Sequence, residues 1–294
     1  MACVLVVAGF LIFRSRHDIL EMLQRISPAL LVASVVLTIL AKGFLADNAR
    51  IAALRNRIQM DFPTAARLYN LSQLGKYLPG SIWQFVGRAA AYRGRGAEYG
   101  QIRDALLVES LWIVAGSALV GLVLTGPGVV DIVTRSLNPT IAWWLAGAVS
   151  LCVVGGAAVL VWKRELAARY VRLSLPSVRV LAVQAGIWSS LGLAFWVLAR
   201  ACGFDISPVF ATGLFAAGYA MGFLVPFAPA GLGVRDGILT LGLLPYIPAG
   251  EALAVTILAR LVYLLVDVGL VVLQEPVFAV IEARARRNDR RRGA

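Results

Sequence analysis

Long apolar runs without charge constrain this chain more than any other feature. Three of them, 141–162, 180–199 and 206–234, contain no Asp, Glu, Lys, Arg or His. Each is about as long as the ~20 residues that an α-helix needs to cross the hydrocarbon core of a bilayer, or longer. With 60% hydrophobic residues and a mean hydropathy of +0.79, the chain cannot hide its apolar side chains in one soluble core. We therefore predict an all-α integral membrane protein.

The positive charges lie in short segments between the apolar runs, which is the positive-inside pattern rather than a nucleic-acid surface. Segments 50–67, 88–103 and 163–179 are basic and are predicted to be cytoplasmic, whereas 125–140 and 200–207 hold one arginine each and are predicted to face outward. We expect a multi-pass protein of a bacterial-type inner (plasma) membrane with a cytoplasmic C-terminus. The positive-inside rule has one exception here, because this topology places Arg14, Arg16 and Arg25 on the outer side.

The runs organise the chain into a single polytopic membrane domain, 1–283, and a basic cytoplasmic tail, 284–294, that would touch anionic headgroups. About seven to eight transmembrane helices are expected. The predicted simple spans are 1–13, which is short, 28–46, 105–124, 141–162, 180–199 and 252–274.

Two further segments are too broken to be simple spans. Segment 68–88 begins and ends among cytoplasmic basic residues, and 208–246 leaves and returns to the outer side. We predict two oppositely oriented re-entrant hairpins, because non-helical backbone at membrane depth must be buried in protein or line a wet cavity. The predicted breaks are Pro79, Gly80, Pro226, Pro229, Gly231 and Gly233.

The two broken segments also resemble each other. Arg88 follows Pro79 by nine residues, and Arg235 follows Pro226 by the same distance. With opposite topology, this match predicts an inverted repeat of about 63–125 and 207–274, an architecture found in many secondary transporters.

Ionisable groups inside the apolar stretches predict a polar site. Glu109, Arg235, Arg260 and Asp267 would each cost roughly 2.5–3.5 kcal/mol at mid-depth, so a membrane protein retains them for a function. On the last span, Arg260, Tyr263 and Asp267 recur at spacings of three and four and share one helical face.

Four cations are the predicted ligands of an anion: Lys76, Arg88, Arg235 and Arg260. A broken backbone beside them would add free N–H groups, and the planar fork of Arg235 suits a phosphate. Glu109, Asp236 and Asp267 are the predicted charge partners or proton carriers. Other interpretations stay open: Lys76 or Arg88 snorkels to headgroups, or Arg235 merely pairs with Asp236 or Glu109 inside the protein.

Enzymatic signatures are missing from the sequence. No nucleophile, base and acid recur together, and neither the single His17 nor the scattered Cys3, Cys152 and Cys202 suggests a metal or disulfide framework. We expect no cofactor, no metal and no catalytic residue.

Two motifs carry a resemblance to a known family. Residues 75–80 (GKYLPG), followed by Trp83 and Arg88, and residues 229–237 (PAGLGVRDG) resemble the flippase-like family, also called the lysylphosphatidylglycerol synthase transmembrane region family. Asp236 stands where the family pattern more often has glutamate. Relatives include the membrane half of the multiple peptide resistance factor and proteins tied to polyprenyl-linked sugar and hopanoid pathways, which implies lipid translocation.

The resulting hypothesis is a lipid flippase or transporter that moves an anionic phospholipid or a polyprenyl-phosphate-linked lipid between leaflets. Three alternatives remain: a membrane-embedded transferase acting on polyprenyl-phosphate, a non-catalytic scaffold for lipid or glycan assembly, and a transporter of small solutes. The lipid, the direction, the energy source and the oligomeric state do not follow from the sequence.

Overall fold

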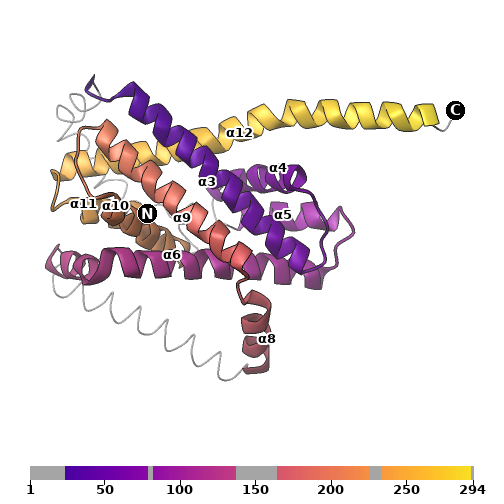
Figure 1. Ribbon diagram of the computed structural model, residues 1–294, viewed down its shortest axis with the longest axis horizontal. Helices are drawn as coiled ribbons and strands as arrows, with labels where there is room; N and C mark the ends of the chain where they lie inside the picture. The colour runs from indigo at the N-terminus through magenta and orange to yellow at the C-terminus, as the bar shows by residue number, and fades with distance from the viewer. Residues whose placement is uncertain (1–23, 79–81, 137–163, 225–232, 293–294) are drawn as a thin grey trace.

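The computed structural model describes residues 24–78, 82–136, 164–224 and 233–292, and within these ranges it contains helices and no strand. This confirms the predicted all-α class. The elements are α3 (Pro28–Arg55), α4 (Phe62–Gln73), the 3-10 helix η1 (Leu74–Tyr77), α5 (Trp83–Arg93), α6 (Tyr99–Ser136), α8 (Arg164–Ser174), α9 (Val178–Ala201), α10 (Pro208–Leu224), α11 (Val234–Leu243) and α12 (Ala249–Arg292) (Figure 1).

Four helical segments are long and apolar enough to cross a membrane: Pro28–Arg55, Tyr99–Gly126, Val178–Ala201 and Ala249–Phe278. They coincide with four of the predicted simple spans. The other two predicted spans, 1–13 and 141–162, lie outside the described residues. The chain is therefore a membrane protein with several apolar spans, and α10 is a further apolar helix of shorter length.

Local sequence signals fix where several helices begin. Ser27 precedes Pro28, and a proline in the first turn needs no N–H partner there. Asp61 caps α4 by accepting a hydrogen bond from the Thr64 N–H at 3.3 Å. Gly233, with a φ of 88°, leads into α11 through a backbone conformation that other residues rarely adopt.

The long helices form an antiparallel bundle. At one end of the α3 and α9 pair, the Ser27 N–H donates to the Ala201 carbonyl at 3.0 Å. At the other end, Arg179 lies 3.0 Å from Asp47. Figure 1 shows α12 running in the direction of α3, with α6 and α9 running the opposite way. These relative directions are the ones that the distribution of loop charges predicts.

Small residues let α6 and α10 approach closely, as in many membrane helix pairs. A Cβ on Gly121 would lie 2.9 Å from the backbone of Ala217. A Cβ on Gly213 would lie 2.6 Å from the side chain of Thr125. This close contact fixes the second broken segment, of which α10 is the first helix, against the span α6.

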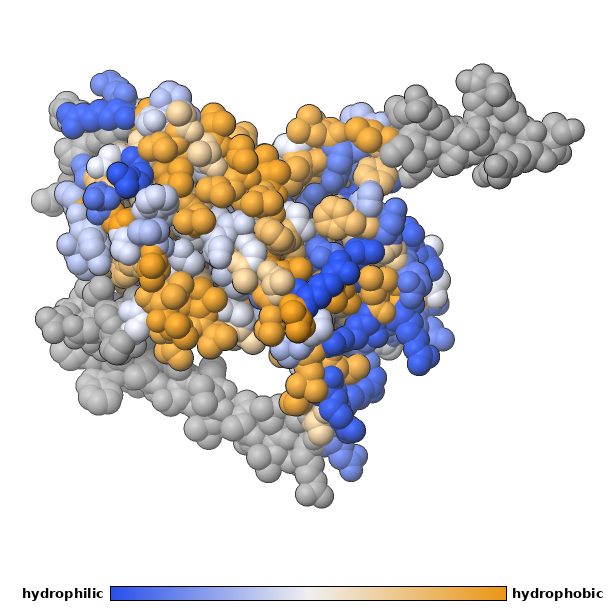
Figure 2. Space-filling model, viewed as in Figure 1, coloured by the Kyte–Doolittle hydropathy of each residue, from blue (hydrophilic) through white to orange (hydrophobic). Residues whose placement is uncertain are grey.

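Apolar side chains cover much of the outer surface. On α3 and α12, Val36, Leu40, Leu265 and Val272 are exposed. Figure 2 shows hydrophobic residues over the middle of the molecule, with hydrophilic residues along the edge that includes α8 and a smaller group at the opposite edge. Such a surface fits hydrocarbon around the bundle.

Each of the two broken segments forms a pair of packed helices. In the first hairpin, α4 and η1 pack against α5, and in the second hairpin α10 packs against α11. The connections at 79–81 and 225–232 lie outside the described residues. Five of the six predicted break residues therefore lie outside the described residues: Pro79, Gly80, Pro226, Pro229 and Gly231. The sixth, Gly233, is described and precedes α11.

Candidate functional site

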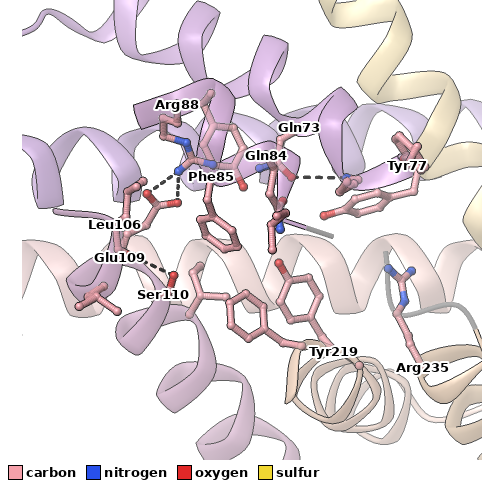
Figure 3. Close-up of a pocket in the computed structure, with 18 of the residues that line it drawn as sticks. Gln73, Tyr77, Gln84, Phe85, Arg88, Leu106, Glu109, Ser110, Tyr219 and Arg235 are labelled. Carbon is pink, nitrogen blue, oxygen red and sulfur yellow. Dashed lines mark hydrogen bonds and ion pairs between the residues drawn. The ribbon is translucent and has the colours of Figure 1, made fainter. Parts of the chain in front are cut away.

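A cavity of about 560 Å³ lies between the two hairpins and the spans α6 and α12 (Figure 3). All four predicted anion ligands line it: Lys76, Arg88, Arg235 and Arg260. Neutral polar groups from several elements complete the polar part of the wall: Tyr69, Gln73, Tyr77, Gln84, Ser110, Tyr219 and Tyr263. The sequence segments that carried the prediction therefore meet in one place.

On one side of the cavity, Arg88 of α5 is paired with Glu109 of α6. The Arg88 guanidinium donates to both Glu109 carboxylate oxygens, and its Nε donates to the Ser72 hydroxyl at 3.3 Å. It also lies 4.7 Å from the centre of the Tyr69 ring. Since Arg88 is only 2% exposed, it is held inside the protein and does not snorkel to headgroups.

A second cluster surrounds Asp267 on α12, which is fully buried. Lys42 Nζ lies 2.5 Å from one carboxylate oxygen, and Lys76 Nζ lies 2.5 Å from the other. The Tyr77 hydroxyl donates to the same carboxylate at 2.7 Å. Lys76 lines the cavity, whereas Lys42 does not. One carboxylate thus neutralises only one of two adjacent lysines.

Arg260 of α12 is paired with Asp236 of α11. The closest approach of the guanidinium and the carboxylate is 3.0 Å. Asp236 also accepts a hydrogen bond from the Gly233 N–H at 3.3 Å. The carboxylate therefore fixes the start of α11, directly after the predicted break, while it neutralises one cation of the cavity.

Arg235 differs from the other arginines and the lysine that line the cavity, each of which has a carboxylate partner. Its Nε is buried without a hydrogen-bond partner, and no carboxylate pairs with it among the described residues. The guanidinium packs instead against the rings of Phe215 and Tyr263, at 4.7 Å and 5.3 Å from their centres. In Figure 3 no interaction is marked from Arg235 to the other residues drawn. Aromatic rings, rather than a carboxylate, are therefore the neighbours of this guanidinium among the described residues.

Tyr263 stands at the centre of three cations. Lys42 lies 3.7 Å, Lys76 4.6 Å and Arg235 5.3 Å from the centre of its ring. The electron-rich face of an aromatic ring stabilises nearby cations. It therefore reduces the repulsion among these three cations.

Apart from Arg103, the remainder of the wall is apolar, and the hairpins touch there. The Phe85 ring of the first hairpin meets the Phe223 ring of the second edge to face, with centres 6.5 Å apart. Ile82 and Leu107 both line the cavity and are 56% and 43% exposed. The cavity thus combines a cationic wall with an apolar part that includes well-exposed side chains.

The structure also differs from the sequence-based expectations. Glu109 pairs with Arg88, rather than with Arg235 or Arg260. Asp236 pairs with Arg260, so the alternative of an internal Arg235–Asp236 pair is not what the described residues form. Asp236 and Asp267 do not line the cavity but neutralise cations that do.

Sequence reasoning missed Lys42, although the signal was present. Lys42 is an ionisable residue inside the predicted span 28–46, the same kind of signal that singled out Asp267. The polar wall residues Gln73, Gln84 and Tyr219 had no such signal, because neutral polar residues are ordinary in membrane helices.

The described residues contain no group of three or more His, Cys, Asp or Glu that could hold a metal ion.

A search of curated proteins found no match to this chain. Residues 1–270 match the family described as the lysylphosphatidylglycerol synthase TM region, and because the match covers most of the chain, the protein belongs to this family of membrane proteins.

Proposed function

We propose that the protein is a lipid flippase or transporter that binds an anionic lipid headgroup in the cavity between its two hairpins and moves the lipid between leaflets. The observation that carries this proposal is Arg235, a cation on the cavity wall without an acidic partner among the described residues. A cation with a buried donor that has no partner is costly, so it is best explained by a ligand that neutralises it.

The proposed binding mode follows from the two parts of the wall. Arg235 can hold two phosphate oxygens with its planar fork. Lys76, Arg88 and Arg260 line the same cavity, but each already has a carboxylate partner and contributes less to an incoming anion. The hydrocarbon tails remain in the bilayer and leave the cavity past Ile82 and Leu107.

The proposed motion uses the hairpins as two halves of an inverted repeat, about 63–125 and 207–274. In this proposal both hairpins are re-entrant and enter from opposite faces of a bacterial-type inner membrane, with the basic tail 284–294 in the cytoplasm. Rocking of one repeat against the other exposes the cavity to each side in turn. Within each half, an ion pair joins the hairpin to the span that follows it: Arg88 with Glu109 in the first half, and Asp236 with Arg260 in the second. These internal links support rigid-body movement of each half.

The proposal is tested by headgroup accessibility in proteoliposomes. Purified protein is reconstituted with labelled phosphatidylglycerol, lysyl-phosphatidylglycerol or an undecaprenyl-phosphate sugar, and the fraction of label reached by an impermeant quencher is followed with time. Faster exchange of one lipid than in protein-free vesicles supports translocation. Exchange no faster than in protein-free vesicles for every lipid, with folded protein and with or without an imposed ion gradient, contradicts it.

The same preparation separates the alternatives. A transferase acting on polyprenyl-phosphate would yield a new lipid product, detectable by mass spectrometry. A scaffold would tolerate charge-neutral substitutions at Arg235 and Glu109 as long as the protein stays folded. A transporter of small solutes would accumulate a soluble anion while leaving lipid headgroups where they were.

A further inference from the structure

We propose that the cavity selects a lipid whose headgroup carries two negative charges, such as a prenyl phosphomonoester or a diphosphate-linked lipid, over a phosphodiester with one charge. This inference rests on the proposed function and defines the substrate class of the same site. It also predicts discrimination against an aminoacylated phospholipid of net positive charge.

The first support is the charge around the cavity. Among the described residues, four paired cations, the unpaired Arg235 and three carboxylates lie in or next to its wall, which leaves a formal excess of two positive charges. The cations are Lys42, Lys76, Arg88, Arg235 and Arg260, and the carboxylates are Glu109, Asp236 and Asp267. Arg103 also lines the cavity, but its side chain is 54% exposed and shares Asp104 with Arg169, which is 51% exposed. Solvent screens these exposed charges, so they are left out of the count.

The two connections that complete the hairpins do not alter this excess. Residues 79–81 are Pro, Gly and Ser, and residues 225–232 are all apolar, proline or glycine. Neither connection brings an ionisable side chain. The two surplus charges are therefore a property of the sequence around the cavity, and they call for an anion of matching charge.

The surplus charges belong to two specific groups. One is Arg235, which has no carboxylate partner among the described residues. The other is one of the two lysines that share Asp267. Of these, Lys76 faces the cavity and Lys42 does not. Lys76 and Arg235 lie against the same Tyr263 ring, at 4.6 Å and 5.3 Å, so one headgroup can reach both.

Lys42 makes the release of Lys76 possible. When Lys76 turns from Asp267 to a phosphate, the carboxylate keeps Lys42 at 2.5 Å and the Tyr77 hydroxyl at 2.7 Å. No bare carboxylate is left in the interior, a state that would cost several kcal/mol. Lys42 is thus a positioning residue that frees a second cation for the ligand, although it does not touch the cavity itself.

An aminoacylated phospholipid would bring positive charge to a cavity that already has a surplus of it. Lysyl-phosphatidylglycerol has one phosphodiester and two ammonium groups, and hence a net charge of +1. Its ammonium groups need carboxylates, but each of the three carboxylates in this network is already held by a cation. A third positive charge beside the surplus of two is unfavourable.

Three probes test the inference by calorimetric titration of the full-length protein in detergent at pH 8. Farnesyl monophosphate is doubly ionised there, because the second pKa of a phosphomonoester is about 6. Its methyl phosphodiester has the same tail and one charge less, and inorganic phosphate has no tail. We expect the monophosphate to bind at least about tenfold more tightly than the methyl diester, the value of one charge-assisted hydrogen bond.

Variants assign the preference to the proposed groups. Lys76→Gln and Lys42→Gln should each reduce the ratio of the affinities for the monophosphate and the methyl diester to near one. Lys76→Arg should retain the wild-type ratio. Arg179→Gln removes an exposed cation that is paired with Asp47 outside the cavity, so it should leave the preference unchanged. Size-exclusion chromatography confirms that each variant is folded before titration.

The outcomes separate the inference from the proposed function. Equal binding of the monophosphate and the methyl diester, or tighter binding of lysyl-phosphatidylglycerol, overturns the charge preference and leaves lipid translocation standing. Inorganic phosphate that binds as tightly as the farnesyl monophosphate overturns both, because the site would then recognise a soluble anion. A preference that survives in Lys76→Gln contradicts the role given to Lys76.

Discussion

Arg88 on α5 donates to both carboxylate oxygens of Glu109 on α6, so a buried ion pair joins the first hairpin to the span that follows it. Both side chains are almost fully enclosed. A pair of this kind adds little net stability compared with an apolar pair, but the loss of one partner leaves an uncompensated charge. The pair therefore fixes the position of the hairpin more than it stabilises the fold.

Glu109→Gln should lower the free energy of unfolding by about 3–5 kcal/mol, because Arg88 keeps its charge without a carboxylate. The double variant Arg88→Gln/Glu109→Gln should recover more than half of that loss, since two neutral amides replace the pair. Thermal unfolding in detergent, arranged as a double-mutant cycle, measures both values. A double variant that loses the sum of the two single losses would show that the residues do not interact.

The shared carboxylate of Asp267 predicts unequal effects of neighbouring substitutions. Asp267→Asn should cost about 3–5 kcal/mol, because it leaves Lys42 and Lys76 side by side without an anion. Lys76→Gln should cost much less, because Lys42 and Asp267 remain as a neutral pair. The comparison uses the midpoint of thermal unfolding at matched protein and detergent concentrations. Equal losses in the two variants would contradict the sharing of Asp267 by two lysines.

Gly75 predicts a steric effect on the first hairpin. A Cβ at this position would lie 2.7 Å from the backbone of Trp83 and Gln84, which brings η1 against the start of α5. Gly75→Ala should therefore destabilise the protein by about 1–3 kcal/mol, as overpacking does.

Gly43 provides the matched control for this change. It lies within α3, and a Cβ there would meet nothing within 4 Å. Gly43→Ala should be neutral or stabilise by about 0.5–1 kcal/mol through helix propensity. The midpoints of thermal unfolding of the two alanine variants are compared with that of the wild type. A Gly75→Ala protein as stable as Gly43→Ala would exclude the close contact.

Spans and charged positions were predictable because the bilayer imposes a simple rule. A helix that crosses hydrocarbon must be apolar, so Glu109, Arg235, Arg260 and Asp267 stood out by their cost alone. Three of the four line the cavity, and the fourth, Asp267, holds a lysine that does. The paired breaks and cations also predicted an inverted repeat with Arg88 and Arg235 at equivalent positions. The repeat stays a prediction, and both arginines line one cavity.

The partner of each charge was not predictable, because it depends on helix rotation and depth rather than on composition. Glu109 could have met three arginines, and its pairing with Arg88 depends on how α5 packs on α6. Lys42 illustrates a different limit. It was visible in the sequence as a charge in a span, but its partner is Asp267, more than two hundred residues away in the chain.

The initial rate of lipid translocation in proteoliposomes, compared between Arg235→Gln and Arg179→Gln, tests most directly whether Arg235 binds the headgroup. Both variants lose one arginine, but only Arg235 lines the cavity. Arg235→Gln should reduce the rate at least about tenfold, the value of one lost charge-assisted contact, while Arg179→Gln keeps the wild-type rate. Equal rates in the two folded variants would contradict a headgroup site at Arg235.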